Sequence, residues 1–295
     1  MKRSLTIFLV ALPFFVALAF LLGGKPPAHD LPLPNPNGYD QLVIAGSMLN
    51  GDAHAYETMS EADLAGLVAT NANALALGRS ALTNECRVPV QYSIADLASS
   101  LTNEEAIKNL AQTMAAEGRL AESQNRPAEA ALAYLDLVHL GMEAGRGGVM
   151  IDAVLGMAIE AVGRQGLENS ANRLDATFCR TIASKLESLD SHRESWEDVL
   201  EQEDRLVSRL SPGLTGKLAT WLFTHIGSTE IRSKLKKHFR EQQEKTRALA
   251  VQFAARAYEL DNGRPPANIK YLVPGYLKTV PQDPATGQDL AYPPR

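Results

Sequence analysis

Apolar residues recur through most of this chain at the three- to four-residue spacing of amphipathic helices, and few segments alternate as strands do. The pattern Ser60-Glu61-Ala62-Asp63 predicts a helix start, because an N-cap serine with an acid three residues later satisfies free backbone N–H groups. A helical stripe after Ser60 continues through Leu64, Leu67, Val68, Leu75 and Leu82. One weak strand pattern follows this stripe, over residues 87–92. These patterns predict an all-α fold.

A helical pair is predicted over residues 103–144, in which Pro127 suits the first turn of the second helix because its missing N–H group costs nothing there. Residues 110–141 resemble a single tetratricopeptide helical hairpin. The residues that carry this resemblance are Gly118, Ala130 and Tyr134. Since no second good copy follows, the resemblance implies a helical bundle with one such hairpin, not a repeat array.

Residues 147–166 form the next helical pattern, and its breadth of apolar positions predicts the most buried helix of the fold. Asp152 and Glu160 are its only acids. Its predicted apolar face consists of Val149, Ile151, Val154, Leu155, Ala158, Ile159 and Val162.

The charge then changes sign along the chain, with an acidic stretch over residues 187–204 followed by a basic stretch over residues 232–247. We expect an antiparallel helical hairpin with partly paired charges, each exposed pair contributing less than about 1 kcal/mol. In an alternative interpretation, the acidic face meets a divalent cation or a basic partner, and the basic stretch contacts anionic lipid headgroups.

An apolar stripe spans residues 212–228, between the two charged stretches. Core packing is one interpretation of this stripe. The other is a helix at a membrane interface or a partner surface, which a tryptophan beside basic residues suits. The contact residues in that second interpretation are Trp221, Leu222, Phe223, Lys236 and Lys237.

The pattern changes again at residue 245. A helical stripe ends at Asp261-Asn262-Gly263, where the glycine is a C-cap signal, and prolines punctuate the rest of the chain. Regular apolar positions between Ile269 and Val280 predict a turn-rich module that folds back onto this helix, with at most a short β element near its end.

The segment AARAYELDNGRPPANIKYLVPGYLKTVPQDPATGQDLAY within this module resembles the helix and loop of G-type pseudopilins of type II secretion. The amino-terminus departs from that family, because it lacks the prepilin-peptidase site. Together with a helical body that contains MIDAVLGMAIEAV, the same ending resembles a group of uncharacterised bacterial membrane-anchored helical proteins.

Residues 1–24 predict a signal anchor or transmembrane helix, because Lys2 and Arg3 precede an uncharged run close to the roughly 20 residues that cross a bilayer. The charges before the run favour a single-pass protein whose bulk is extracytoplasmic. A cleaved signal, giving a secreted or periplasmic protein, is the alternative. A proline-rich linker over residues 25–38, a helical domain over residues 39–244 and the turn-rich module over residues 245–295 complete the predicted organisation.

Composition restricts the partners. The formal net charge of -5 argues against nucleic acid, which binds to a concentrated basic face. Cys86 and Cys179 are the two cysteines, and an oxidising compartment would permit a disulfide between them if the fold brings them together. Two small buried hydrophobic side chains are the alternative interpretation.

No hydrolase elbow, phosphate-binding loop, zinc helix or dinucleotide loop occurs in the sequence, so no catalytic residue or cofactor is assigned. Asp283 and Asp289 could hold calcium in an oxygen-rich turn, although a proline-aspartate turn explains the same residues without an ion.

Three functions are consistent with these patterns. The leading hypothesis is a membrane-anchored helical module of the cell envelope that binds a protein partner or supports an assembly. The second is an envelope enzyme whose site is built from scattered polar residues, and this hypothesis predicts a pocket where titratable groups converge. The third is peripheral binding of a lipid surface through residues 212–247.

Overall fold

The computed structural model describes residues 32–91, 97–210 and 229–292. Regular secondary structure in these residues is helical, and an isolated bridge between Gln282 and Asp289 is their one β contact, so the all-α prediction is confirmed for this part of the chain. Residues 87–91, where a strand was expected, form no regular element. The helices are α2 (Gly38–Ser47), α3 (Glu61–Thr70), α4 (Ala72–Ala81), α5 (Leu97–Ser123), α6 (Pro127–Ala144), α7 (Met150–Ser170), α8 (Ala176–Ser191), α9 (Trp196–Leu210) and α11 (Thr229–Asn262).

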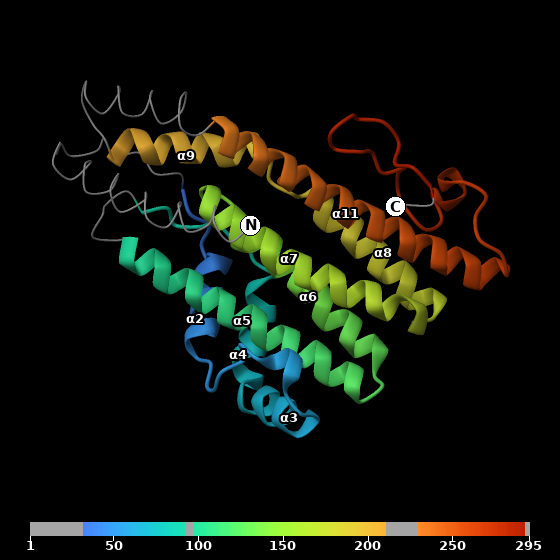
Figure 1. The fold of residues 1–295 in the computed structure, drawn as a ribbon, viewed down its shortest axis with the longest axis horizontal. Helices are drawn as coiled ribbons and strands as arrows, with labels where there is room; N and C mark the ends of the chain where they lie inside the picture. The colour runs from blue at the N-terminus through green and yellow to red at the C-terminus, as the bar shows by residue number, and fades with distance from the viewer. Residues whose placement is uncertain (1–31, 92–96, 211–228, 293–295) are drawn as a thin grey trace.

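The helices lie in layers (Figure 1). The long helix α11 follows one side of the molecule with α8 and α9 beside it, α5 to α7 lie in the middle, and α2 to α4 pack under α5. Within the described ranges, no helix is both long and apolar enough to cross a bilayer. The anchor predicted over residues 1–24 lies outside those ranges.

The predicted helix start at Ser60 is confirmed, because the Ser60 hydroxyl accepts a hydrogen bond from the Asp63 N–H group. The helix does not continue to Leu82, however. Asn71 separates α3 from α4, and its side-chain amide donates to the carbonyl oxygens of Asn50 and Leu67, each at 2.9 Å. A buried asparagine that bonds backbone groups of two segments competes with helical geometry, which is why the stripe breaks here.

Helices α5 and α6 form the predicted hairpin, with α6 beginning at Pro127. The Tyr134 ring packs against Gly118 of α5 and Gly166 of α7. A β-carbon built on Gly118 would lie 2.7 Å from this ring, and one on Gly166 would lie 2.3 Å from it. These two glycines therefore leave the space that the ring occupies. The tetratricopeptide character of the hairpin stays a prediction.

The predicted apolar face of α7 is confirmed only in part, because Val149 and Ile159 are buried but three other members are not. Ile151, Val154 and Val162 are 47%, 42% and 37% exposed, whereas Asp152 and Glu160 are buried. The reason is the close approach of α6 and α7 at their glycines, which fixes the rotation of α7. A β-carbon built on Gly156 would lie 2.4 Å from the carbonyl oxygen of Gly141, so only small residues fit on the face toward α6.

Glu160 and Arg164 of α7 are buried and belong to one cluster of ion pairs. Glu160 is 1% exposed, and its two carboxylate oxygens accept hydrogen bonds from Arg193 at 2.6 and 3.0 Å. The hydroxyl of Thr246 on α11 donates to the same carboxylate, and Arg164 forms a further ion pair with it at 3.1 Å. Although burial opposes the charge, Arg193 holds the pKa of Glu160 below its ordinary value. The cluster thereby joins α7, α11 and the segment after α8.

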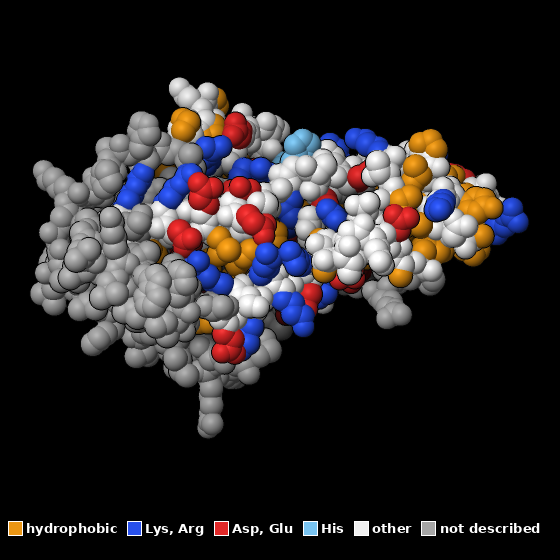
Figure 2. Space-filling model, turned by 90° about the horizontal axis from the view of Figure 1, so that it is seen from above, with side chains coloured by type: hydrophobic (Ala, Val, Ile, Leu, Met, Phe, Trp, Pro, Cys, Tyr) orange, Lys and Arg blue, Asp and Glu red, His pale blue; other side chains and the backbone are white. Residues whose placement is uncertain are grey.

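The predicted antiparallel pairing of acidic and basic stretches is confirmed for α9 and the first half of α11. Arg232 lies 2.7 Å from Asp204, and Lys236 lies 2.8 Å from Glu197. The first acids of the stretch belong to α8 instead. On the face formed by α9 and α11, basic and acidic side chains are intermixed (Figure 2), as expected for paired charges.

The carboxy-terminal module folds back onto the preceding helix, as predicted. Leu272, Leu277 and Leu290 are buried in the same core cluster as Phe253 of α11. Gly263 ends α11 with a φ of 71°, and its N–H group donates to the carbonyl oxygen of Glu259. The boundary predicted between residues 244 and 245 lies inside α11, and the main core cluster includes residues on both sides of it.

Candidate functional site

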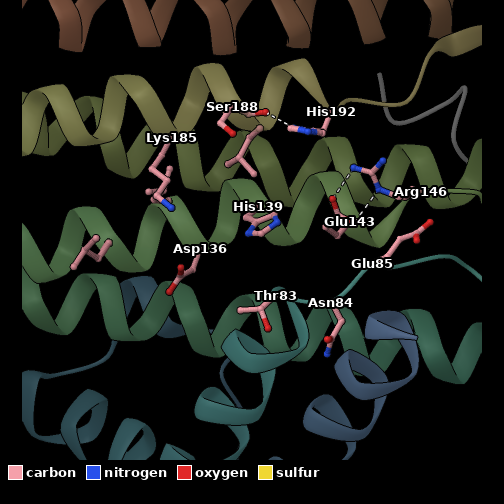
Figure 3. A pocket seen from close by; sticks show the side chains of 13 residues that line it. Thr83, Asn84, Glu85, Asp136, His139, Glu143, Arg146, Lys185, Ser188 and His192 are labelled. Atoms are coloured by element: carbon pink, nitrogen blue, oxygen red, sulfur yellow. Dashed lines mark hydrogen bonds and ion pairs between the residues drawn. The ribbon is translucent and has the colours of Figure 1, made fainter. Parts of the chain in front are cut away.

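A cleft of about 680 Å³ opens between α6, α8 and the turn after α4. Figure 3 shows the side chains of α6 and α8 facing each other across it, with the turn after α4 on a third side. Its lining combines charged, imidazole and leucine side chains, which is typical of a binding site that fixes orientation with a few polar groups. The residues are Thr83, Asn84, Glu85, Leu132, Leu135, Asp136, His139, Glu143, Arg146, Lys185, Ser188, Leu189 and His192.

Helix α6 contributes Asp136, His139 and Glu143, which share one face because successive turns bring them together. Both carboxylates already have cationic partners. Asp136 lies 2.7 Å from the Nε atom of Arg79, and Glu143 accepts two hydrogen bonds from Arg146 at 2.6 and 2.8 Å. The two-bond geometry fixes the Arg146 guanidinium at one end of the cleft.

Helix α8 contributes Lys185 and Ser188, and its C-cap residue His192 follows at the same spacing. The Nδ1 atom of His192 lies 2.8 Å from the carbonyl oxygen of Ser188, so Nδ1 carries the proton and donates. The Nε2 atom of His192 is the ring nitrogen that remains for a ligand contact. Lys185 is exposed and has no ion-pair partner among the described residues.

His139 lies half-buried between these two sides. Burial lowers the pKa of His139 below its ordinary value, because the charged imidazolium loses hydration, and Arg146 and Lys185 lower it further. Glu143 and Asp136 act in the opposite direction. The imidazole is therefore neutral at pH 7 and offers one donor and one acceptor nitrogen.

Cys86 lies beside the cleft without contributing a nucleophile. Burial, together with the neighbouring Glu143 carboxylate, raises the pKa of its thiol to about 12. A thiol in this state is protonated at neutral pH and unreactive, since the thiolate is the nucleophile. The arrangement can bind a ligand through polar contacts and does not present Cys86 for covalent chemistry.

A second hollow of about 420 Å³ continues the cleft toward α9. It shares Glu85, Arg146 and His192 with the cleft, so the two form one groove along the surface. The groove has room for an extended chain as well as a compact ligand.

The two cysteines are not joined in the structure. Both are buried free thiols, and Cys86 contacts the carbonyl oxygen of Asn84, whereas Cys179 on α8 contacts that of Ala171. Burial raises the pKa of the Cys179 thiol to about 11. The geometry corresponds to the alternative interpretation, in which each cysteine is a small core side chain.

Of the five residues predicted to contact a membrane or a partner, the structure describes only Lys236 and Lys237. Trp221, Leu222 and Phe223 lie outside the described residues. On α11, Lys236 pairs with Glu197, while Lys237 is 80% exposed and lies 3.7 Å from Glu241.

The calcium candidates Asp283 and Asp289 belong to a self-contained turn. The Asp283 carboxylate accepts hydrogen bonds from the N–H groups of Ala285 and Thr286, which holds the pKa of Asp283 below its ordinary value. Asp289 lies in the isolated β-bridge with Gln282. Across the described ranges, no three histidine, cysteine or acidic side chains are grouped as metal ligands.

The cleft was not predicted from the sequence, because its lining residues form none of the known catalytic or metal-binding motifs. The useful signal was different: Asp136, His139 and Glu143 repeat the spacing of Lys185, Ser188 and His192. The first set forms a polar stripe on α6, which is otherwise largely apolar, whereas α8 carries further polar residues. No family model matches the sequence, and the searches among characterised proteins and solved structures return no significant match.

Proposed function

We propose that the protein is a helical binding module, and that the groove between α6 and α8 holds a segment of a partner protein. The observation that carries this proposal is the cleft of about 680 Å³, in which side chains of α6 and α8 converge and the leucines Leu132 and Leu189 add apolar surface. Open grooves of this composition suit an extended polypeptide, whose backbone and side chains need both polar and apolar contacts.

The site of action is the cell envelope in this proposal. The amino-terminal pattern of Lys2 and Arg3 before a long apolar run supports a membrane anchor with the helical body outside the cytoplasm. The resemblance of residues 110–141 to a tetratricopeptide hairpin supports the same kind of role, since such hairpins pack into surfaces that bind peptides. Anchoring would hold the groove near partners at the membrane.

Site-specific photo-crosslinking in cells that make the full chain tests this function. A photoreactive phenylalanine derivative replaces Leu132, which lines the cleft and is 44% exposed. The matched control replaces Leu260, which is 42% exposed at the end of α11. We expect a discrete covalent adduct at position 132 and none at position 260.

A second variant links the adduct to the groove itself. Thr83 is exposed at the mouth of the cleft, so Thr83→Trp fills the cleft with little effect on the core. The adduct at position 132 should disappear in this variant while the circular dichroism spectrum stays unchanged. An adduct that also forms at position 260, or one that survives Thr83→Trp, would show that the groove is not the binding site.

A further inference from the structure

The ion pairs of the cleft leave one of its two cations, Lys185, without a partner among the described residues, while the buried carboxylate of Glu143 is neutralised. Glu143 is held by Arg146 in a two-bond ion pair, and Asp136 is held by Arg79. Lys185 has no such partner among the described residues, although its charge is close enough to act on His139. Glu85 also lines the cleft and lies 3.5 Å from Arg87, so the charged lining residue without an ion pair among the described residues is the cation Lys185.

The imidazoles of His139 and His192 line the same cleft as Lys185 and can add hydrogen bonds to a ligand that Lys185 binds. The Nδ1 atom of His192 lies 2.8 Å from the Ser188 carbonyl oxygen, which leaves Nε2 as the ring nitrogen for a ligand contact. His139 faces Asp136, Glu143 and Arg146 from its own side, Lys185 from α8 and Glu85 from the turn after α4. Because burial and the cations keep His139 neutral, a bound anion would draw a proton onto it.

We propose that the groove recognises an acidic peptide segment, with Lys185 forming an ion pair with a ligand carboxylate and His139 and His192 supplying hydrogen bonds. This inference rests on the proposed function and adds the chemical class of the ligand. Leu132 is exposed beside these groups and receives an apolar residue next to the acidic one.

A carboxylate fits this site better than a phosphate does. Phosphates are usually bound by arginine forks or by the N–H groups at a helix amino-terminus. Here the cleft lies at the carboxy-terminal end of α4, and the Arg146 fork is used by Glu143. Lys185, His139 and His192 can instead each form a single hydrogen bond to a carboxylate, which is smaller than a phosphate.

Fluorescence polarisation of labelled peptides with the detergent-solubilised full chain tests the inference. One peptide repeats leucine, glutamate and alanine, and the matched peptide carries glutamine in place of each glutamate. We expect only the glutamate peptide to bind, with affinity that increases as the pH falls from 8 to 6. Lys185→Gln should weaken binding about tenfold, and His139→Gln should remove the pH dependence.

Lys234→Gln is the control, because Lys234 is exposed on α11 and lies far from the cleft residues in sequence, pairing with Glu230. It should bind the glutamate peptide as the wild type does. Equal binding of the two peptides, or equal affinity of Lys185→Gln and Lys234→Gln, would overturn the inference. So would displacement of the peptide by millimolar inorganic phosphate alone, since that result would assign the site to phosphate.

The outcome also separates this inference from the function on which it rests. If the glutamate peptide fails to bind but the Leu132 adduct forms and is lost in Thr83→Trp, the acidic ligand is wrong and the groove function stands. If neither the peptide nor the adduct is observed, both fall.

Discussion

Asp152 lies at the start of α7, where three acids satisfy backbone N–H groups that have no partner within the helix. Its carboxylate accepts a hydrogen bond from the Val149 N–H group at 2.8 Å, while Glu203 of α9 accepts from Met150 and Glu194 accepts from Gly147. Negative groups are favourable at a helix amino-terminus. Burial nevertheless raises the pKa of Asp152 to about 7, and the nearby Glu203 raises it further.

This raised pKa predicts a specific pH dependence of stability. The folded state keeps the Asp152 proton up to about pH 7, whereas the unfolded chain loses it near pH 4, so the folded state loses stability as the pH rises through that window. Asp152→Asn keeps an oxygen for Val149 and carries no charge. We expect the free energy of unfolding of this variant to exceed that of the wild type by about 1 kcal/mol at pH 5 and by about 2–4 kcal/mol at pH 8.

Urea unfolding at pH 5, 6.5 and 8 measures the difference, with Glu168→Gln as the control because Glu168 is exposed on the same helix. The control should differ from the wild type by an amount that does not change with pH. A constant difference between Asp152→Asn and the wild type at all three values would mean that Asp152 is ionised throughout.

At the scale of helices, periodicity predicted where α7 lies but not which way it faces. The branched apolar residues Ile151, Val154 and Val162 were expected inside, because burying them is favourable and burying a charge is costly. The structure reverses this choice because Gly141 and Gly156 bring the α6 and α7 backbones together. That contact joins residues far apart in sequence, so a pattern within one helix cannot reveal it.

Features decided within a few residues of the chain were predictable. The Ser60 N-cap, the Pro127 helix start and the Gly263 helix end follow from local hydrogen bonding and backbone geometry. The break at Asn71 was not, because its amide is held by the carbonyl oxygen of Asn50 on a separate segment.

Two glycine-to-alanine substitutions, one at the α6–α7 contact and one on an exposed helix surface, should change stability in opposite directions. In Gly156→Ala, the new methyl group would lie 2.4 Å from the Gly141 carbonyl oxygen, so the helices must separate and the free energy of unfolding should fall by about 1–3 kcal/mol. Gly66→Ala in α3 meets nothing within 4 Å and should stabilise the protein by about 0.5–1 kcal/mol.

Urea unfolding curves of the two variants and the wild type decide this prediction. Equal midpoints for Gly156→Ala and Gly66→Ala would mean that α6 and α7 do not touch through their glycines.

At the scale of the whole molecule, the groove is assembled from three separate stretches of chain. The turn at residues 83–85, the α6 stripe with His139 and the α8 stripe with His192 meet only after folding. Each stripe was visible in the sequence, but their meeting depends on how α6 and α8 pack. The buried cluster around Glu160 of α7 supports that packing. Its carboxylate accepts hydrogen bonds from Arg193, which follows α8, and from Thr246 of α11.

The central claim is that this groove binds an anionic segment through His139, His192 and Lys185. Its most direct test is a nitrogen-15 NMR spectrum of the histidine imidazoles in the full chain, titrated with the glutamate peptide. The account predicts that the His139 and His192 signals shift, that the pKa of His139 rises on binding, and that the signals of the distant His54 and His238 stay in place. Shifts of similar size at His54 and His238, or none at His139 and His192, would contradict the account.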